Sequence, residues 1–214
     1  MSTQLKEHPI ICNAQEVNAV LAGHKTQHRV ILSSQPYTND HGWQVLEIGG
    51  VRISDQCVTT SPLDEAIKKR LPTTNAAPYR IGDRLWVQEP SLIHCDWDWF
   101  YADNTLVECK EPFTSNDLHL PWDDEHQEYT GPIAAEYLPR WASRLLLEVT
   151  DIRIERVRDI THNDSADEGC FNFTGYEKFV PISAFISYWM AKHGDDGWFT
   201  NPWVWVIEFK KVND

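Results

Sequence analysis

The run RLLLEVTDIRI at 144–154 constrains the fold most, because its apolar residues alternate as in a half-buried β-strand. The strand pattern is strongest over Leu145–Val149 and changes phase near Asp151, so that Ile152 and Ile154 continue it out of step. A phase change of this kind predicts a bulge or bend, which a strand needs in order to wrap around a small barrel. Further strand-type runs at 84–88 and 203–209 lead us to expect all three in one closed or nearly closed barrel.

Short helices and a hairpin are predicted around these strands. Asn13 and Thr161 are helix caps, Gly194 is a helix stop, and Gly49-Gly50 joins two short strand-type runs. The expected helices cover 14–22, 62–71, 161–169 and 181–193, and further strands cover 29–32, 43–48 and 51–53. Strands outnumber helices, which indicates a mainly β, α+β fold in one domain over 1–214.

The acidity of the chain is concentrated in one segment. Residues 91–138 hold eleven Asp or Glu and one basic residue, whereas the formal net charge of the whole chain is −13. Long tracts of double-stranded nucleic acid need clustered Lys and Arg, so we expect no such partner. The acidic, aromatic segment is interpreted as an insertion that forms a lid or binding loop.

Several classes of protein are excluded by the composition. No stretch approaches 18 uninterrupted apolar residues and the start MSTQLKEHPI lacks a signal peptide, so we expect a cytoplasmic protein with no membrane partner. The five cysteines are widely spaced, and the nine histidines show no HExxH pattern. We therefore expect no disulfide framework, no metal and no cofactor.

The segment GHKTQHR at 23–29 follows a predicted helix and resembles the Gly-x-Lys signature of ASCH domains. Other blocks fit the longer phage and prophage members of that family, namely GDRLWVQE at 82–89 and the segments 138–160, 165–169 and 201–209. The resemblance implies a PUA-like β-barrel with flanking short helices and a cleft beside the lysine loop. The segment at about 91–138 then enlarges this fold.

Small bacterial members of this family are similar to amidohydrolases that remove the acyl group from N4-acylated cytidine. They use a Lys, a Thr three residues later and a Glu at the end of a short helix. The resemblance places the Lys at Lys25 and the Glu at Glu168, while His28 stands at the Thr position. The usual arginine of the family falls on Val30, with Arg29 beside it.

Physical arguments also single out Lys25 and Glu168. Lys25 follows a helix C-terminus, where a cation interacts favourably with the helix dipole, but a desolvated Lys in a pocket is the alternative. Glu168 lies in the last turn of its helix, where an anion is disfavoured, so a functional role or a specific ion pair is indicated. We expect the two side chains to face one cleft with a tryptophan in its wall.

The remaining candidates have alternative structural roles. The Thr26 hydroxyl needs an adjacent base to act as a nucleophile, and His28 is either a general base or a surface histidine. Two arginines either bind a carboxylate or phosphate or form structural ion pairs. The candidate substrate-binding residues are Gly23, Arg29, Arg144, Trp86 and Glu89.

The leading hypothesis is a pocket protein for a modified nucleoside or an exposed RNA base, most concretely an amidohydrolase of N4-acylated cytosine nucleosides. The alternatives are a non-catalytic module for short single-stranded RNA and a phage or prophage interaction protein that uses its acidic insertion. Glu168→Gln is expected to abolish deacylation and to leave folding unchanged or slightly improved.

Overall fold

A computed structural model describes residues 6–41, 44–55, 67–69, 72, 76–93, 99–107, 131–170 and 182–212. The chain has an α+β fold in which strands outnumber helices. It divides into two compact units, the first formed by 1–23, 83–148 and 211–214, and the second by 24–82 and 149–210. Within the described ranges, no helix combines the length and the apolar character that crossing a membrane requires.

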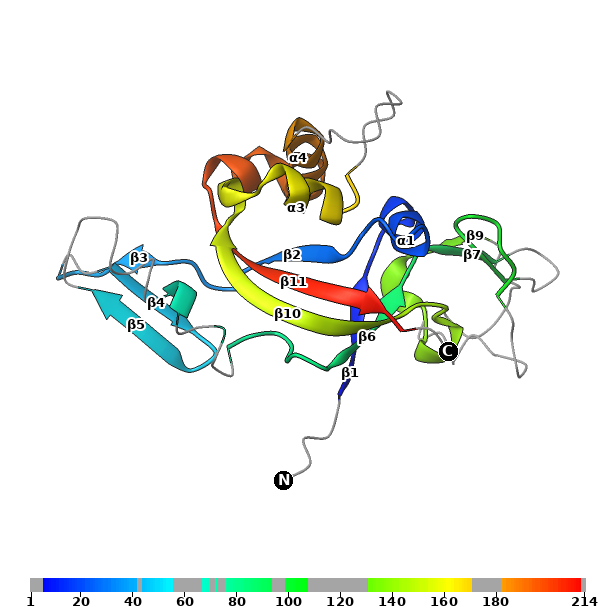
Figure 1. The fold of residues 1–214 in the computed structure, drawn as a ribbon, viewed down its shortest axis with the longest axis horizontal. Helices are drawn as coiled ribbons and strands as arrows, with labels where there is room; N and C mark the ends of the chain where they lie inside the picture. The colour runs from blue at the N-terminus through cyan, green and yellow to red at the C-terminus, as the bar shows by residue number, and fades with distance from the viewer. Residues whose placement is uncertain are drawn as a thin grey trace, which may run out of the picture. The chain divides into compact units, whose positions relative to one another are not determined.

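The largest sheet has the hydrogen-bonded order β1-β6-β10-β11-β2 (Figure 1). Its strands are β1 (Glu7–Ile11), β6 (Arg84–Gln88), β10 (Leu146–Arg156), β11 (Trp203–Lys211) and β2 (Gln27–Ile31). β1 is parallel to β6, whereas β6 with β10 and β11 with β2 are antiparallel. The three predicted barrel strands thus share one sheet, which is open among the described residues, with β1 and β2 at its edges.

β10 confirms the predicted change of phase. Leu147 and Val149 are buried, Thr150 and Asp151 are both exposed, and burial then resumes at Ile152. Two consecutive exposed residues reverse the face that the strand presents, because side chains alternate along a strand. The boundary between the two units falls inside this strand, after residue 148.

The first unit contains α1 (Ala14–Leu21) and a three-stranded sheet. Asn13 and Glu16 form the predicted capping box of α1, and Gly23 follows its end with φ of 72°. The small sheet joins β8 (Trp99–Tyr101), β7 (Ser91–Ile93) and β9 (Gly131–Ile133) over a core that includes Trp99. The 3₁₀ turns Ala135–Tyr137 and Arg140–Ala142 follow. These strands lie in the expected insertion, of which 94–98 and 108–130 are outside the described residues.

A second three-stranded sheet belongs to the second unit. It has the order β3 (Tyr37–Thr38), β4 (Gln44–Ile48) and β5 (Val51–Asp55). Gly49 and Gly50 join β4 to β5 with φ of 55° and 78°, as a tight hairpin turn requires. The predicted hairpin is confirmed. The predicted helix at 62–71 falls mostly outside the described residues, within which 67–69 are helical.

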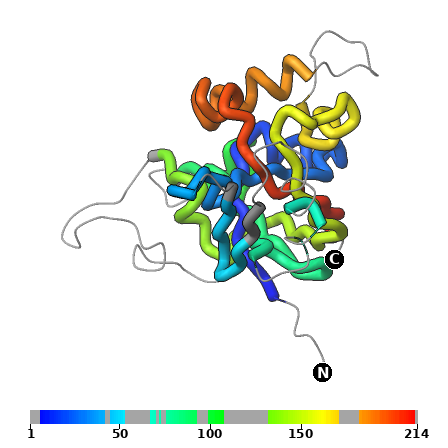
Figure 2. Tube along the Cα trace, turned by 90° about the vertical axis from the view of Figure 1, so that its left-hand side faces the viewer, coloured from blue at the N-terminus to red at the C-terminus, as the bar shows by residue number. Residues whose placement is uncertain are grey.

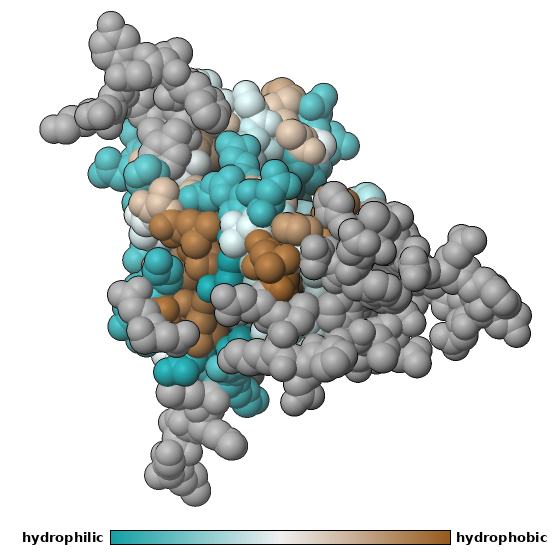
Figure 3. Space-filling view, turned by 90° about the vertical axis from the view of Figure 1, so that its right-hand side faces the viewer, coloured by the Kyte–Doolittle hydropathy of each residue, from teal (hydrophilic) through white to brown (hydrophobic). Residues whose placement is uncertain are grey.

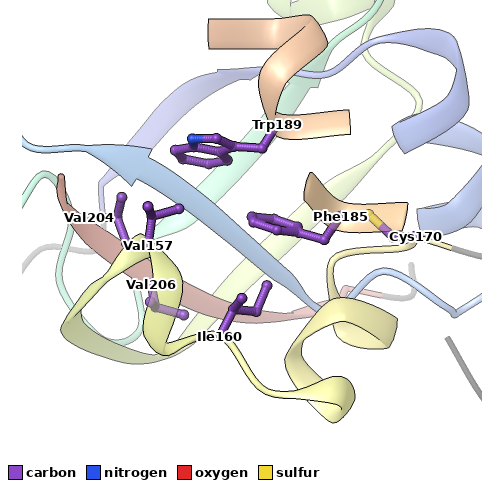
Figure 4. Packing of buried hydrophobic residues seen from close by; sticks show 7 residues of the cluster. All are labelled: Val157, Ile160, Cys170, Phe185, Trp189, Val204 and Val206. Atoms are coloured by element: carbon purple, nitrogen blue, oxygen red, sulfur yellow. The ribbon is translucent and has the colours of Figure 1, made fainter. Parts of the chain in front are cut away.

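Two helices cover one face of β2, β10 and β11 in the second unit (Figures 1 and 2). They are α3 (His162–Asp167), preceded by the 3₁₀ turn Val157–Asp159, and α4 (Ile182–Phe199). Phe185 and Trp189 of α4 lie over Val204 and Val206 of β11 (Figure 4). The predicted stop at Gly194 is only partly right, because φ of 74° there kinks the chain but helix resumes to Phe199.

Some large apolar side chains remain exposed in each unit. Figure 3 looks onto the side of Figure 1 on which α1 and β7 lie, and it shows apolar surface gathered beside polar surface. The exposed apolar residues of the first unit are Ile11, Leu21, Leu106 and Trp141, and those of the second are Tyr37, Ile81 and Phe199. Scattered exposure of this kind is normal for a folded protein.

Candidate functional site

Three polar side chains lie buried on one face of the chain around the start of β2. Lys25, Gln27 and Arg29 are each 2% exposed and stand two residues apart, so an extended chain points them the same way. Lys25 also forms an isolated antiparallel bridge with Glu168, the C-cap residue that follows α3. This bridge brings the end of α3 against the beginning of β2.

The centre of the site is an ion pair between Lys25 and Glu168. Lys25 Nζ is 2.9 Å from Glu168 Oε2 and also donates to the Glu168 carbonyl at 3.0 Å. Arg29 Nη1 lies 3.0 Å from the other carboxylate oxygen, Oε1. The Lys25 and Glu168 side chains are 0% and 2% exposed. Two cations therefore hold a buried carboxylate that the helix dipole alone would disfavour.

The ion pair extends outward as an alternating charge network. Arg29 Nη2 contacts Glu155 Oε2 at 3.2 Å and lies 3.6 Å from Asp164 Oδ1. Arg153 then contacts Glu155 at 2.7 Å, Asp164 at 2.8 Å and Glu208. The Arg153 side chain is 29% exposed, so the network leads from a buried pair to the protein surface.

Asp164 connects this network to the start of α3. Its Oδ2 accepts hydrogen bonds from the Thr161 N–H and hydroxyl, while Oδ1 accepts from Gln27 and Arg153. Burial acts to raise the pKa of Asp164, but the Thr161 hydrogen bonds and the charge of Arg29 outweigh it and lower the pKa. Asp164 therefore stays ionised while it caps the helix and binds the sheet.

Thr26 and Asp167 lie immediately beside the central pair. The Thr26 N–H donates to the Asp167 carbonyl at 2.8 Å, and the Thr26 side chain is exposed. Burial raises the pKa of the Asp167 carboxyl, and repulsion from Asp164 and Glu208 raises it further. A hydrogen bond with the Thr26 side chain and the charge of Arg153 partly offset this rise.

The other candidates of the lysine loop are placed differently. His28 is buried in β2 opposite Ile207 and, by strand alternation, points to the face opposite Arg29. The Gly23 N–H donates to the Val20 carbonyl, and the Thr26 N–H is likewise used by Asp167. Neither group is available as an oxyanion donor in this arrangement. The guanidinium carbon of Arg29 lies 5.7 Å from the centre of the Phe185 ring.

Arg144 and Glu89 form a separate ion pair in the first unit. The guanidinium donates to both Glu89 oxygens at 2.8 Å, contacts Asp103 at 2.9 Å and lies 4.1 Å from the centre of the Tyr101 ring. Burial raises the pKa of Glu89 although the Arg144 hydrogen bonds oppose it. Trp86, half-buried in β6, belongs to the same unit. These three substrate-binding candidates are thus assigned to a different unit from Lys25, and the arginine is occupied by carboxylates.

Several members of the network were not singled out from the sequence. They are Gln27, Arg153, Glu155, Asp164, Asp167 and Glu208. The sequence of β10 could have indicated two of them, because Arg153 and Glu155 stand two residues apart and alternate with apolar residues. Charged residues on the helix-covered face of a strand need partners there.

Lys25, Arg29 and Arg153 neutralise the carboxylates of this site. Within the part of the chain that the structure describes, no group of three His, Cys, Asp or Glu side chains is arranged to hold a metal. No family model, curated protein or solved structure matches this chain.

Proposed function

We propose that the second unit handles a modified nucleoside or an exposed RNA base, and most concretely hydrolyses the amide of N4-acylated cytosine nucleosides. The observation that supports this most is the 2.9 Å pair of Lys25 and Glu168, both almost completely buried. These are the two residues to which the ASCH resemblance assigns catalysis. We also propose that the chain folds as a PUA-like barrel.

The proposed reaction needs a group that moves one proton. A water oxygen adds to the acyl carbon, and a carboxylate beside Lys25 takes one proton from that water. The carboxylate then passes the proton to N4 as the C–N bond breaks, which releases cytidine and the acid. General acid–base catalysis of this kind contributes about 10²–10⁴-fold. Glu168 is the carboxylate that the resemblance assigns to this step.

The test is hydrolysis of N4-acetylcytidine by the purified protein, followed by chromatography of the released cytidine. Lys25→Met and Glu168→Gln are expected to lower kcat/KM by about 10²-fold or more. Glu47→Gln is the matched control, because the Glu47 side chain is exposed and forms a surface ion pair with Arg52. Circular dichroism at the assay temperature shows whether each variant is folded. Wild-type protein that releases no cytidine would refute the proposal.

A non-catalytic RNA-binding module is the second candidate function. It is favoured by the way in which Arg29 and Lys25 occupy both Glu168 oxygens, as in a purely structural ion pair. Its test is fluorescence anisotropy with a short single-stranded RNA. Binding by a protein that does not hydrolyse N4-acetylcytidine would replace the enzyme proposal with this one.

A further inference from the structure

This inference rests on the proposed function. The geometry points to a different pair of reacting groups from the pair that the resemblance assigns. We propose that Thr26 is the nucleophile of the hydrolysis and that Asp167 is its general base. Lys25 and Glu168 are then positioning residues, which hold the two reacting groups together.

The backbone contacts place Thr26 beside Asp167. The Thr26 N–H donates to the Asp167 carbonyl at 2.8 Å, and on the adjoining residues Lys25 Nζ donates to the Glu168 carbonyl at 3.0 Å. The Lys25–Glu168 bridge fixes the same two segments in antiparallel register. In this register Thr26 and Asp167 lie opposite each other, so the hydroxyl and the carboxyl emerge side by side, as a nucleophile and its base require.

Exposure separates this pair from the buried one. Thr26 is exposed and Asp167 is half-buried, so a substrate can reach them from solvent. The Lys25 and Glu168 side chains are 0% and 2% exposed, and both Glu168 oxygens are occupied by cations. A substrate therefore does not reach the Glu168 carboxylate in this arrangement.

The charges around Asp167 suit a base. Asp164 of α3 and Glu208 of β11 repel its carboxylate, and Arg153 of β10 is the cation that faces it. Burial and these two anions raise the pKa of Asp167 above its ordinary value. A carboxyl with a raised pKa accepts a proton more readily near neutral pH than an ordinary aspartate does. Asp167 also ends α3, where an anion is disfavoured by the helix dipole.

The reaction balances in two steps. Thr26 Oγ1 bonds to the acyl carbon as its proton moves to Asp167, and Asp167 gives that proton to N4 as the C–N bond breaks. Cytidine leaves and an acyl ester of Thr26 remains. Water then bonds to the ester carbon, giving one proton to Asp167, which returns it to Thr26 Oγ1 as the ester breaks. The net change consumes one water and forms cytidine and a carboxylic acid.

Four variants test the assignment with N4-acetylcytidine as substrate. Thr26→Ala and Asp167→Asn are expected to lower kcat by about 10²–10⁴-fold, whereas Thr26→Ser retains a hydroxyl and measurable activity. Asp195→Asn makes the same chemical change at an exposed residue of α4 and serves as the control. The acidic limb of the kcat–pH profile is expected to disappear in Asp167→Asn and to persist in the control.

Covalent trapping provides a readout that a structural role would not give. Wild-type protein treated with p-nitrophenyl acetate is expected to gain one acetyl group, which peptide mass spectrometry locates on Thr26. Asp167→Asn is expected to acquire that group at least about 10²-fold more slowly. Hydrolysis that persists in Thr26→Ala, with no acetyl group on Thr26, would overturn the inference and leave the proposed function standing.

The two proposals can fail separately. If wild-type protein does not hydrolyse N4-acetylcytidine, the proposed function fails. Acetylation of Thr26 by p-nitrophenyl acetate, dependent on Asp167, would still support the nucleophile–base pair. If the ester labels lysines at the surface and not Thr26, the pair itself is refuted.

Discussion

Glu168 shows how a partner distant in sequence changes what a residue does. Its position at a helix end suggests an anion that the helix dipole repels, so that neutralising it would relieve repulsion. The structure instead surrounds its carboxylate with Lys25 and Arg29, at 2.9 and 3.0 Å. Glu168→Gln removes the negative charge that lies between Lys25 and Arg29, so we expect a loss of stability instead of the unchanged folding predicted from the helix dipole.

Glu168→Gln is expected to lower the free energy of unfolding by about 3–5 kcal/mol, the usual cost of breaking a buried pair from one side. The double variant Lys25→Met/Glu168→Gln removes one of the two cations and is expected to recover part of that loss. Urea denaturation of the wild type, both single variants and the double variant measures the coupling. Equal stability of Glu168→Gln and wild type would contradict the pair as described.

Asp167 should make stability depend on pH in a predictable direction. Its folded-state pKa is raised above the ordinary 3.8, so the folded protein binds that proton more tightly than the unfolded chain. Ionising Asp167 therefore destabilises the fold as pH rises from 3.8 through the raised pKa. Asp167→Asn is expected to raise the melting temperature above that window and to leave it unchanged below the window. Thermal denaturation at a series of pH values checks this, and a variant that lowers stability at neutral pH would contradict it.

Gly197 of α4 has almost no room for a side chain. A Cβ added at Gly197 would lie 2.6 Å from His193 Cβ, and the Gly197 carbonyl accepts a hydrogen bond from Trp189 Nε1 at 2.8 Å. Gly197→Ala is expected to cost about 1–3 kcal/mol of unfolding free energy by overpacking. Asp196→Ala, at the exposed neighbouring residue, is the control for urea denaturation. Matching stabilities of the two variants would contradict the predicted overpacking at Gly197.

Local signals predicted the elements, whereas the site depends on distant partners. The capping boxes of Asn13 and Thr161 and the alternation in β10 act within a few residues, so the sequence alone locates them. β1 was missed because its five residues, with a proline among them, carry no clear alternation. Lys25 and Glu168 were found through a family resemblance. Arg29 was not recognised as the second cation on Glu168, because the two residues stand 139 apart in the chain.

At the scale of the whole molecule, charge distinguishes the candidate partners. The chain carries a formal net charge of −13, which opposes a phosphate backbone. Any affinity for a short RNA is expected to fall steeply between about 50 and 200 mM salt, while kcat/KM for neutral N4-acetylcytidine changes less than about twofold. Anisotropy and hydrolysis measured in the same buffers check this. A steep salt dependence of hydrolysis would mean that the true substrate is charged.

The separation of 143 residues between Lys25 and Glu168 also determines when the site can exist. During synthesis the lysine emerges long before its carboxylate, so most of the chain must leave the ribosome before the ammonium can be buried. Contacts between residues so far apart in sequence form slowly, because the entropy cost of closing the intervening loop opposes them. The ion pair of Lys25 and Glu168 is therefore among the later parts of the fold to form, and a chain released before residue 168 would lack it.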